Sequence, residues 1–146
     1  MNADSRTLYV AEPAAQYLVR PPVVIDCSVL VAFLFREPSL QLATAKIDGR
    51  SLKAPYLLNI EVSSVALKKK KQGMGEFVDA GVEAMTGMEI ELFDVKTREA
   101  FALAMRYKLS AYDAAYLWLA AELKCPLATF DQQLAEAAKE HLASLP

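Results

Sequence analysis

The sequence contains few of the residues that build thiolate or histidine-based sites. Its 146 residues include two cysteines, Cys27 and Cys125, which are far apart and form no C-x-x-C spacing. Such a pair favours buried thiols in a reducing compartment over a zinc site or a disulfide framework. The one histidine, His141, lies near the C-terminus, where we expect it at the surface of a last helical turn. The sequence therefore argues against catalysis by a Ser-His or Cys-His pair.

Long hydrophobic runs and an excess of positive charge are also missing. No apolar run approaches the ~20 residues that a membrane span needs. The first 22 residues carry Asp4 and Glu12 and lack the basic and apolar regions of a signal peptide. We therefore expect a soluble, cytoplasmic protein without membrane contact. The formal net charge of −2 excludes a global basic field, although a local patch could still bind nucleic acid.

What the sequence does contain is an alternation of short apolar segments and helical patterns after Pro21 and Pro22. We expect an N-terminal arm over residues 1–22 and one domain over residues 23–146. Strands are predicted at 23–26, 51–55, 88–95 and 125–130, and helices at 28–37, 39–49, 56–73, 75–87, 97–110, 111–124 and 131–142. Strands separated by helices pair in parallel, and wholly apolar strands are covered on both faces. The sequence therefore predicts a three-layer α/β/α sandwich around a short, mainly parallel sheet.

Four carboxylates that are distant in the sequence share one kind of position. Each stands at the end of a predicted strand or in the first turns of a predicted helix: Asp26, Glu61, Asp113 and Asp131. The carboxyl ends of parallel strands line one edge of a sheet, so these side chains should converge in one cleft. Ordinary structural roles are also available, because Asp131 suits an N-cap and Ser110 with Asp113 forms an S-x-x-D capping box.

Taken together, the four acids predict a metal site. No Lys or Arg lies within their four stretches, and crowded like charges raise one another's pKa values or recruit a cation. Oxygen ligands without His or Cys suit a hard cation, Mg²⁺ or Mn²⁺. A cation of this kind can activate a water and stabilise developing charge on a phosphate. The acids therefore favour metal-dependent hydrolysis of phosphodiester bonds.

Three stretches carry a resemblance to a known family: VVIDCSVLVAFLFREP, NIEVSSVAL and LSAYDAAYLWLAAELKCPLATFDQQL. Over residues 23–142 the chain resembles PIN-domain proteins, and among them the VapC-type toxin ribonucleases of type II toxin–antitoxin pairs. The resemblance implies a sheet flanked by helices and RNA cleavage that depends on Mg²⁺ (or Mn²⁺). It also implies a homodimer and inhibition by a cognate VapB-like antitoxin.

The resemblance also assigns roles to individual residues. The four acids would bind the metal and carry catalysis. Ser28, which could also open the first helix, and Thr129 match hydroxyl positions that hydrogen-bond the acids or the waters of the metal. The position three residues after Glu61, often Asn in the family, is Ser64 here, which puts one hydrogen bond at the site in doubt. The arm over residues 1–22 is a second departure, because many relatives begin almost at the first strand.

Candidates for RNA contacts are less sharply defined. Basic side chains near the ends of two predicted helices could bind phosphates: Lys68, Lys69, Lys70 and Arg36, with Lys46 as a further candidate. A solvated helix C-terminus with a favourable dipole charge is the preferred interpretation of the lysine run, and the RNA contact is kept as an alternative. Tyr112, Tyr116 and Trp118 could stack on bases, but their helical spacing favours core or dimer packing.

Rival interpretations fit less well. A haloacid-dehalogenase fold needs a second Asp two residues after the first, where this chain has Ser28. A receiver domain needs paired acids after the first strand and a Lys after the last, and neither is present. The remaining alternative is a PIN-like RNA-binding or protein-interaction module with little or no catalysis, which the presence of all four acids disfavours.

Overall fold

The computed structural model describes residue 9 and residues 20–146, so most of the predicted arm lies outside the described residues. The strands are β1 (Pro22–Ile25), β2 (Ser51–Pro55), β3 (Ile90–Phe93) and β4 (Leu127–Ala128). The helices are α1 (Cys27–Leu34), α2 (Leu40–Ile47), α3 (Leu57–Lys71), α4 (Gly75–Thr86), α5 (Thr97–Tyr107), α6 (Ala111–Leu123) and α7 (Gln132–Ala143). In this described part, no helix combines the length and the apolar character needed to cross a membrane.

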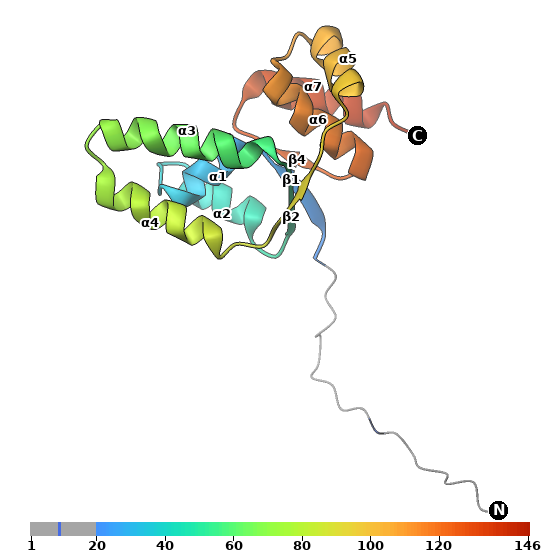
Figure 1. The fold of residues 1–146 in the computed structure, drawn as a ribbon. Coiled ribbons are helices and arrows are strands. Elements are labelled where there is room, and N and C mark those ends of the chain that lie inside the picture. The colour runs from blue at the N-terminus through green and yellow to red at the C-terminus, as the bar shows by residue number, and fades with distance from the viewer. Residues whose placement is uncertain (1–8, 10–19) are drawn as a thin grey trace, which may run out of the picture.

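The four strands form one parallel sheet in the order β3-β2-β1-β4. Every connection between successive strands contains helices, as parallel pairing requires. Figure 1 shows α1 to α4 on one side of the sheet and α5 to α7 on the other. The predicted three-layer α/β/α architecture with a short parallel sheet is thereby confirmed.

The strand order reverses beside β1. The chain runs from β1 to β2 to β3 in one direction and then returns to place β4 on the opposite side of β1. In open parallel sheets, ligands bind outside the carboxyl ends of the strands at such a reversal. Asp26 directly follows β1, and Asp131 follows β4 by three residues. Two of the predicted acids therefore lie at the position where this topology places a binding crevice.

Helix α6 lies at the centre of one helical layer. Its residues 114–120 are all buried, because α6 packs against β1 and β2 on one side and against α5 and α7 elsewhere. A helix that is hydrophobic all round belongs in the interior of a protein. The buried position of α6 holds its first turn, which contains Asp113, against the sheet.

Close packing of α4 on α1 depends on one glycine. A Cβ atom added at Gly81 would lie 2.5 Å from Cδ1 of Phe35 and 2.7 Å from the carbonyl oxygen of Leu34. Neither distance is compatible with ordinary van der Waals contact, and a backbone oxygen cannot rotate away. Gly81 therefore sets how closely α4 approaches the helix that begins at Asp26.

Several boundaries differ from the sequence prediction, and two of the affected elements flank the candidate site. Helix α1 begins at Cys27, not at Ser28, because the Asp26 carboxylate caps it by accepting a hydrogen bond from the Val29 amide. The strand predicted at 125–130 is only Leu127–Ala128, and Pro126 before it has no N–H to donate to a neighbouring strand. Both differences shorten or shift elements around the candidate site without changing their order.

Candidate active site

Asp26 is the buried centre of the candidate site, with 5% of its surface exposed. Its Oδ1 accepts hydrogen bonds from Ser28 Oγ at 2.6 Å and from the Val29 amide at 3.2 Å, and its Oδ2 accepts one from Thr129 Oγ1. Burial raises the pKa of Asp26, the three hydrogen bonds partly lower it, and the nearby Asp131 raises it further. The carboxylate is therefore fixed in orientation, yet its ionised form is disfavoured.

Two hydroxyl groups connect the ends of β1 and β4. Ser28 Oγ donates to Asp26 and accepts from the Phe130 amide at 2.9 Å. Thr129 Oγ1 donates to the same carboxylate and accepts from the Asp131 amide at 2.9 Å. Because a hydroxyl can donate and accept at once, each one holds Asp26 and the segment after β4 together. Ser28 and Thr129 are the two hydroxyls that the sequence linked to the acids.

Glu61 reaches the site from α3. It is half-buried, and its Oε1 accepts a hydrogen bond from Tyr116 Oη at 2.7 Å. Burial raises the pKa of Glu61, the bond from Tyr116 lowers it, and the charges of Asp26 and Asp113 raise it again. The sequence placed Tyr116 in core packing and missed this bond. Tyr116 lies three residues after Asp113, a spacing that puts both side chains on one face of α6. This spacing is the sequence signal that places Tyr116 near the acids.

Asp113 and Asp131 occupy the first turns of α6 and α7. Ser110 caps α6 by accepting from the Asp113 amide at 3.1 Å, and Asp131 caps α7 through Oδ1, which accepts from the Leu134 amide at 2.8 Å. Burial raises the pKa of Asp113, and the charges of Asp131 and Asp26 raise it further. The capping roles read from the sequence are therefore real, and they leave other carboxylate oxygens without a capping partner.

The four carboxylates act on one another electrostatically. Asp26, Glu61 and Asp113 each have a pKa raised in part by another member of the group. Within residues 20–146 no Lys or Arg forms an ion pair with any of the four. The structure thus brings uncompensated acidic side chains within electrostatic range of one another, and their role as a metal site stays a prediction.

The carboxylates are nevertheless not packed tightly around one point. Among the described residues, no three His, Cys, Asp or Glu side chains lie close enough to share one metal ion. The donor chemistry fits a hard divalent cation, since all four side chains offer carboxylate oxygens. The separation between them means that the arrangement shown is not itself a coordination sphere.

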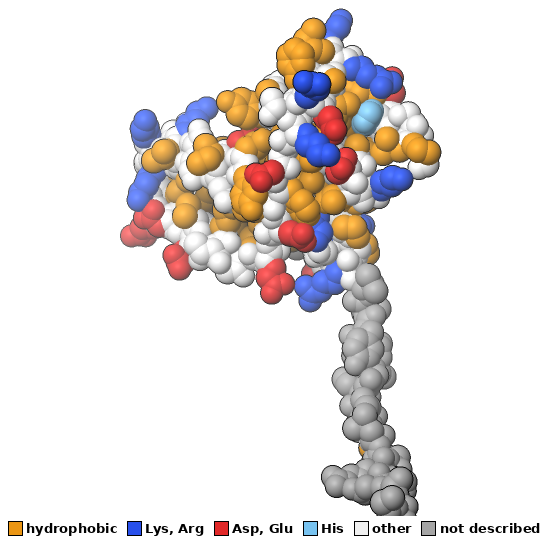
Figure 2. All heavy atoms as spheres, turned by 45° about the vertical axis from the view of Figure 1, so that its right-hand side comes forward, with side chains coloured by type: hydrophobic (Ala, Val, Ile, Leu, Met, Phe, Trp, Pro, Cys, Tyr) orange, Lys and Arg blue, Asp and Glu red, His pale blue; other side chains and the backbone are white. Residues whose placement is uncertain are grey.

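The other residues predicted for the site lie apart from this group. Ser64 is exposed on α3, one turn after Glu61. Lys69 pairs with Glu37 at 3.1 Å, and Lys70 pairs with Asp79 at 2.7 Å. Their charges are therefore already partly compensated, whereas the predicted RNA contacts Lys68 and Arg36 are exposed. Figure 2 shows both signs of charge dispersed over one face of the molecule, with hydrophobic side chains exposed between them.

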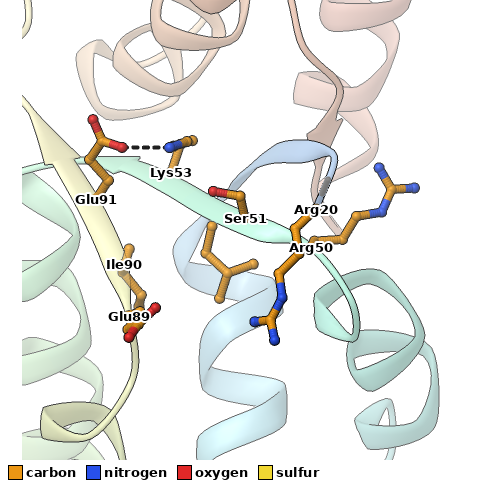
Figure 3. A pocket seen from close by; sticks show the side chains of 8 residues that line it. Arg20, Arg50, Ser51, Lys53, Glu89, Ile90 and Glu91 are labelled. Carbon is orange, nitrogen blue, oxygen red and sulfur yellow. Dashed lines mark hydrogen bonds and ion pairs between the residues drawn. The ribbon is translucent and has the colours of Figure 1, made fainter. Parts of the chain in front are cut away.

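A hollow of about 540 Å³ lies at the opposite edge of the sheet. It is lined by residues before and within the first halves of strands, among them Arg20, Arg50 and Lys53 (Figure 3). Figure 3 shows the two arginine side chains diverging and Lys53 paired with Glu91. Because parallel sheets bind ligands at the carboxyl ends of their strands, this hollow is not the candidate active site.

Comparison with known proteins assigns the fold to a family. The sequence profile of the PIN domain matches residues 23–140. The chain belongs to the PIN domain family. This PIN-domain chain is 28% identical over 121 residues to a protein named Ribonuclease VapC3 from Pyrobaculum aerophilum, a match that covers 78% of this chain and 92% of that protein. It shares its fold with the crystal structure of PAE2754 from Pyrobaculum aerophilum, with a TM-score of 0.64, 20% identity and coverage of 84% and 93% of the two chains. The predicted resemblance to PIN-domain proteins of the VapC type is confirmed.

Proposed function

We propose that this chain is an endoribonuclease that hydrolyses RNA phosphodiester bonds with a divalent cation, Mg²⁺ or Mn²⁺, and that it is the toxin of a type II toxin–antitoxin pair. The catalytic acids would be Asp26, Glu61, Asp113 and Asp131. The observation that carries this proposal is the electrostatic influence of four carboxylates on one another near the reversal of strand order, without a paired Lys or Arg in residues 20–146. The likeness to a protein named Ribonuclease VapC3 supports RNA as the substrate.

The proposed roles follow from how each side chain is held. A bound divalent cation would supply an activated water and offset the charge that develops on the phosphate. Asp26 is the preorganised ligand, because Ser28 and Thr129 fix both of its oxygens. Glu61 is oriented by Tyr116. Ligands must lose their protons before they bind a cation, so the raised pKa values make cation binding strengthen as the pH rises.

Cleavage of labelled RNA by the purified protein tests the proposal. Asp26→Asn should lower the rate in Mg²⁺ or Mn²⁺ by about 100-fold or more, because a ligand that is lost costs at least as much as a partner that orients one. Asp48→Asn is the matched control, since Asp48 is exposed at the end of α2 and outside the acidic group. An Asp26→Asn variant that cleaves RNA as fast as the parent in matched Mg²⁺ would show that the site assignment is wrong.

One observation favours a second candidate, a PIN-like RNA-binding or protein-interaction module with little or no catalysis. In the described part of the chain, the carboxylates do not form a group of three around one point. Parent protein that binds RNA in EDTA but cleaves none in Mn²⁺ would favour this module. Cleavage that requires Mn²⁺ or Mg²⁺ and is lost in Asp26→Asn would favour the nuclease.

We also propose that the chain forms a homodimer. On α5, Phe101 and Met105 lie one helical turn apart with 66% and 68% of their surfaces exposed. Adjacent exposed apolar side chains of this size are typical of a protein interface. Light scattering should report a dimer for the parent and a monomer for Met105→Glu. A dimer that persists in this variant would place the interface elsewhere.

The proposed VapB-like antitoxin would need a surface of its own. A hollow of about 720 Å³ lies between α1 and α4, and Phe33, Phe77 and Ala80 are among its lining residues. A groove between two helices can accept the apolar face of a partner helix. Phe77→Glu should weaken a complex purified with a VapB-like antitoxin and leave RNA cleavage unchanged. Equal affinity in this variant would exclude the hollow as the antitoxin site.

A further inference from the structure

A further hollow, of about 680 Å³, opens beside the carboxylates along strand β4. We call it the β4 groove and define it by Leu42, Lys46, Thr129, Phe130 and Lys139, which are among its lining residues. Strand β4 is the last strand of the sheet, α2 belongs to one helical layer and α7 to the other. The groove therefore crosses this edge strand between the two helical layers.

The β4 groove is continuous with the acidic site. Thr129 lines the groove and also donates its hydroxyl proton to Asp26. Phe130, the next residue, also lines the groove, and its amide donates to Ser28. Asp131 follows directly. If a polymer binds with its reacting bond at the acids, the unit next to that bond would therefore lie in this groove.

The chemistry of the β4 groove differs from that of the acidic site. Its described lining is mostly apolar and contains two cations, Lys46 and Lys139, and no acidic side chain. Neither lysine forms an ion pair with an acid in residues 20–146. The Phe130 side chain is 43% exposed. A groove that holds an aromatic residue and two cations suits a nucleotide, because bases stack on aromatic rings and lysines bind phosphates.

We infer that the β4 groove binds the nucleotide next to the scissile phosphate of a single-stranded RNA, with Phe130 stacking on its base and Lys46 and Lys139 contacting the backbone. This inference rests on the proposed ribonuclease function. It adds a binding site for the part of the RNA that does not contact the four acids. It also differs from the predicted use of the lysine run, in which Lys69 and Lys70 are already paired with acids.

A second copy of the chain is a poorer occupant of the groove. Two-fold pairing through the same surface would bring the lysines of both copies together, and like charges repel. Strand β4 has only two residues with which to extend a sheet across such an interface. Charge complementarity therefore favours a polyanion over a second copy.

Equilibrium binding in EDTA tests the groove separately from catalysis. The probes are fluorescein-labelled oligouridylate and oligoadenylate of about 12 nucleotides, a length within the usual site size for single strands. Phe130→Ala should weaken binding by about 10-fold, as the loss of one stacked base does. Val82→Ala is the matched control, because Val82 is an apolar side chain, 41% exposed on α4, that lies outside the β4 groove. It should bind like the parent.

The lysines provide a second readout that does not depend on how well the Phe130 variant folds. The double variant Lys46→Ala, Lys139→Ala should make the negative slope of log affinity against log salt shallower by about 1.4. Each phosphate contact on a single strand contributes about 0.7 to the size of this slope. Lys96→Ala, at the exposed start of α5, is the control and should leave the slope unchanged. Circular dichroism of each variant verifies the fold.

The outcomes separate the two proposals. Loss of affinity in the groove variants together with no cleavage by the parent in Mn²⁺ supports the groove and overturns the nuclease. Cleavage by the parent with unchanged affinity and salt slope in the groove variants supports the nuclease and overturns the groove. An absence of RNA binding in EDTA by the parent overturns the groove as well. Conversion of a dimer to a monomer by Phe130→Ala, without change in RNA affinity, shows that a second copy occupies it.

Discussion

Replacing Asp26 with asparagine should separate the structural cost of the buried carboxylate from its proposed use. The side chain accepts three hydrogen bonds, from Ser28, Val29 and Thr129. An asparagine oxygen can keep the two on Oδ1, and the amide nitrogen then faces the Thr129 hydroxyl. At most one hydrogen bond is lost, at a cost of about 1 kcal/mol.

Removal of the charge acts in the opposite direction. A raised pKa means that the fold disfavours the ionised form of Asp26, so a neutral side chain relieves that penalty. In EDTA at pH 7 we therefore expect the free energy of unfolding of Asp26→Asn to lie within about 1 kcal/mol of the parent value. The melting temperatures should then agree within about 4 °C.

Added Mg²⁺ should stabilise the parent and not the variant. A ligand at about 100 times its dissociation constant stabilises the folded state by about 2.7 kcal/mol, or roughly 5–10 °C for a chain of this length. Thermal denaturation followed by circular dichroism, with and without Mg²⁺, measures both quantities, and Asp48→Asn should behave like the parent. A variant that gains as much from Mg²⁺ as the parent would refute the role of Asp26 as a ligand. A loss of more than about 3 kcal/mol in EDTA would refute the hydrogen-bond argument.

The raised pKa values also determine how the free energy of unfolding changes with pH in EDTA. The folded state raises the pKa values of Asp26, Glu61 and Asp113, so it holds protons that the unfolded chain has released. The free energy of unfolding should therefore fall as the pH rises from about 4 through the raised pKa values, and it should level off above them. The fall should be smaller in Asp26→Asn. A parent that becomes more stable across this interval would contradict the crowding of the acids.

Three further substitutions test the supporting contacts. Thr129→Val removes one donor to the buried carboxylate and one acceptor for a backbone amide, so urea denaturation should show a loss of about 1–3 kcal/mol, and cleavage should fall by about 10- to 100-fold. Tyr116→Phe removes the bond that lowers the pKa of Glu61, so the acidic limb of the pH–rate profile should move to higher pH while the melting temperature changes little. Gly81→Ala should destabilise by about 1–2 kcal/mol, because overpacking against a backbone carbonyl of α1 outweighs the better helix propensity of alanine; a higher melting temperature would contradict this.

The layers of the fold could be predicted from the sequence because they depend on local patterns. Apolar β-branched segments that alternate with helical periodicity define parallel pairing and covered faces, and the predicted elements occur in the predicted order. The strand order could not be predicted in this way, because no periodicity states that β4 pairs with β1 and not with β3. That pairing creates the crevice beside Asp26.

The electrostatic influence of the acids on one another could be predicted, whereas the contacts that hold them could not. Asp26 and Thr129 are 103 positions apart, and Glu61 and Tyr116 are 55 apart. Neither pair has a local sequence signature that specifies a hydrogen bond. The β4 groove is likewise made by α2 and α7, which lie at opposite ends of the described domain.

Capping and catalysis are not competing explanations for these carboxylates. Asp26 and Asp131 each use one oxygen to accept an amide hydrogen bond at the start of a helix. In a parallel sheet, a helix that follows a strand starts at the carboxyl edge of that strand, so a capping acid is placed at the binding crevice by the needs of its own helix. The cap bonds also tether each carboxylate to its own backbone segment, which accounts for acids that repel one another without forming a tight group in the described residues. A cation that binds there must therefore draw together side chains that their helices hold apart.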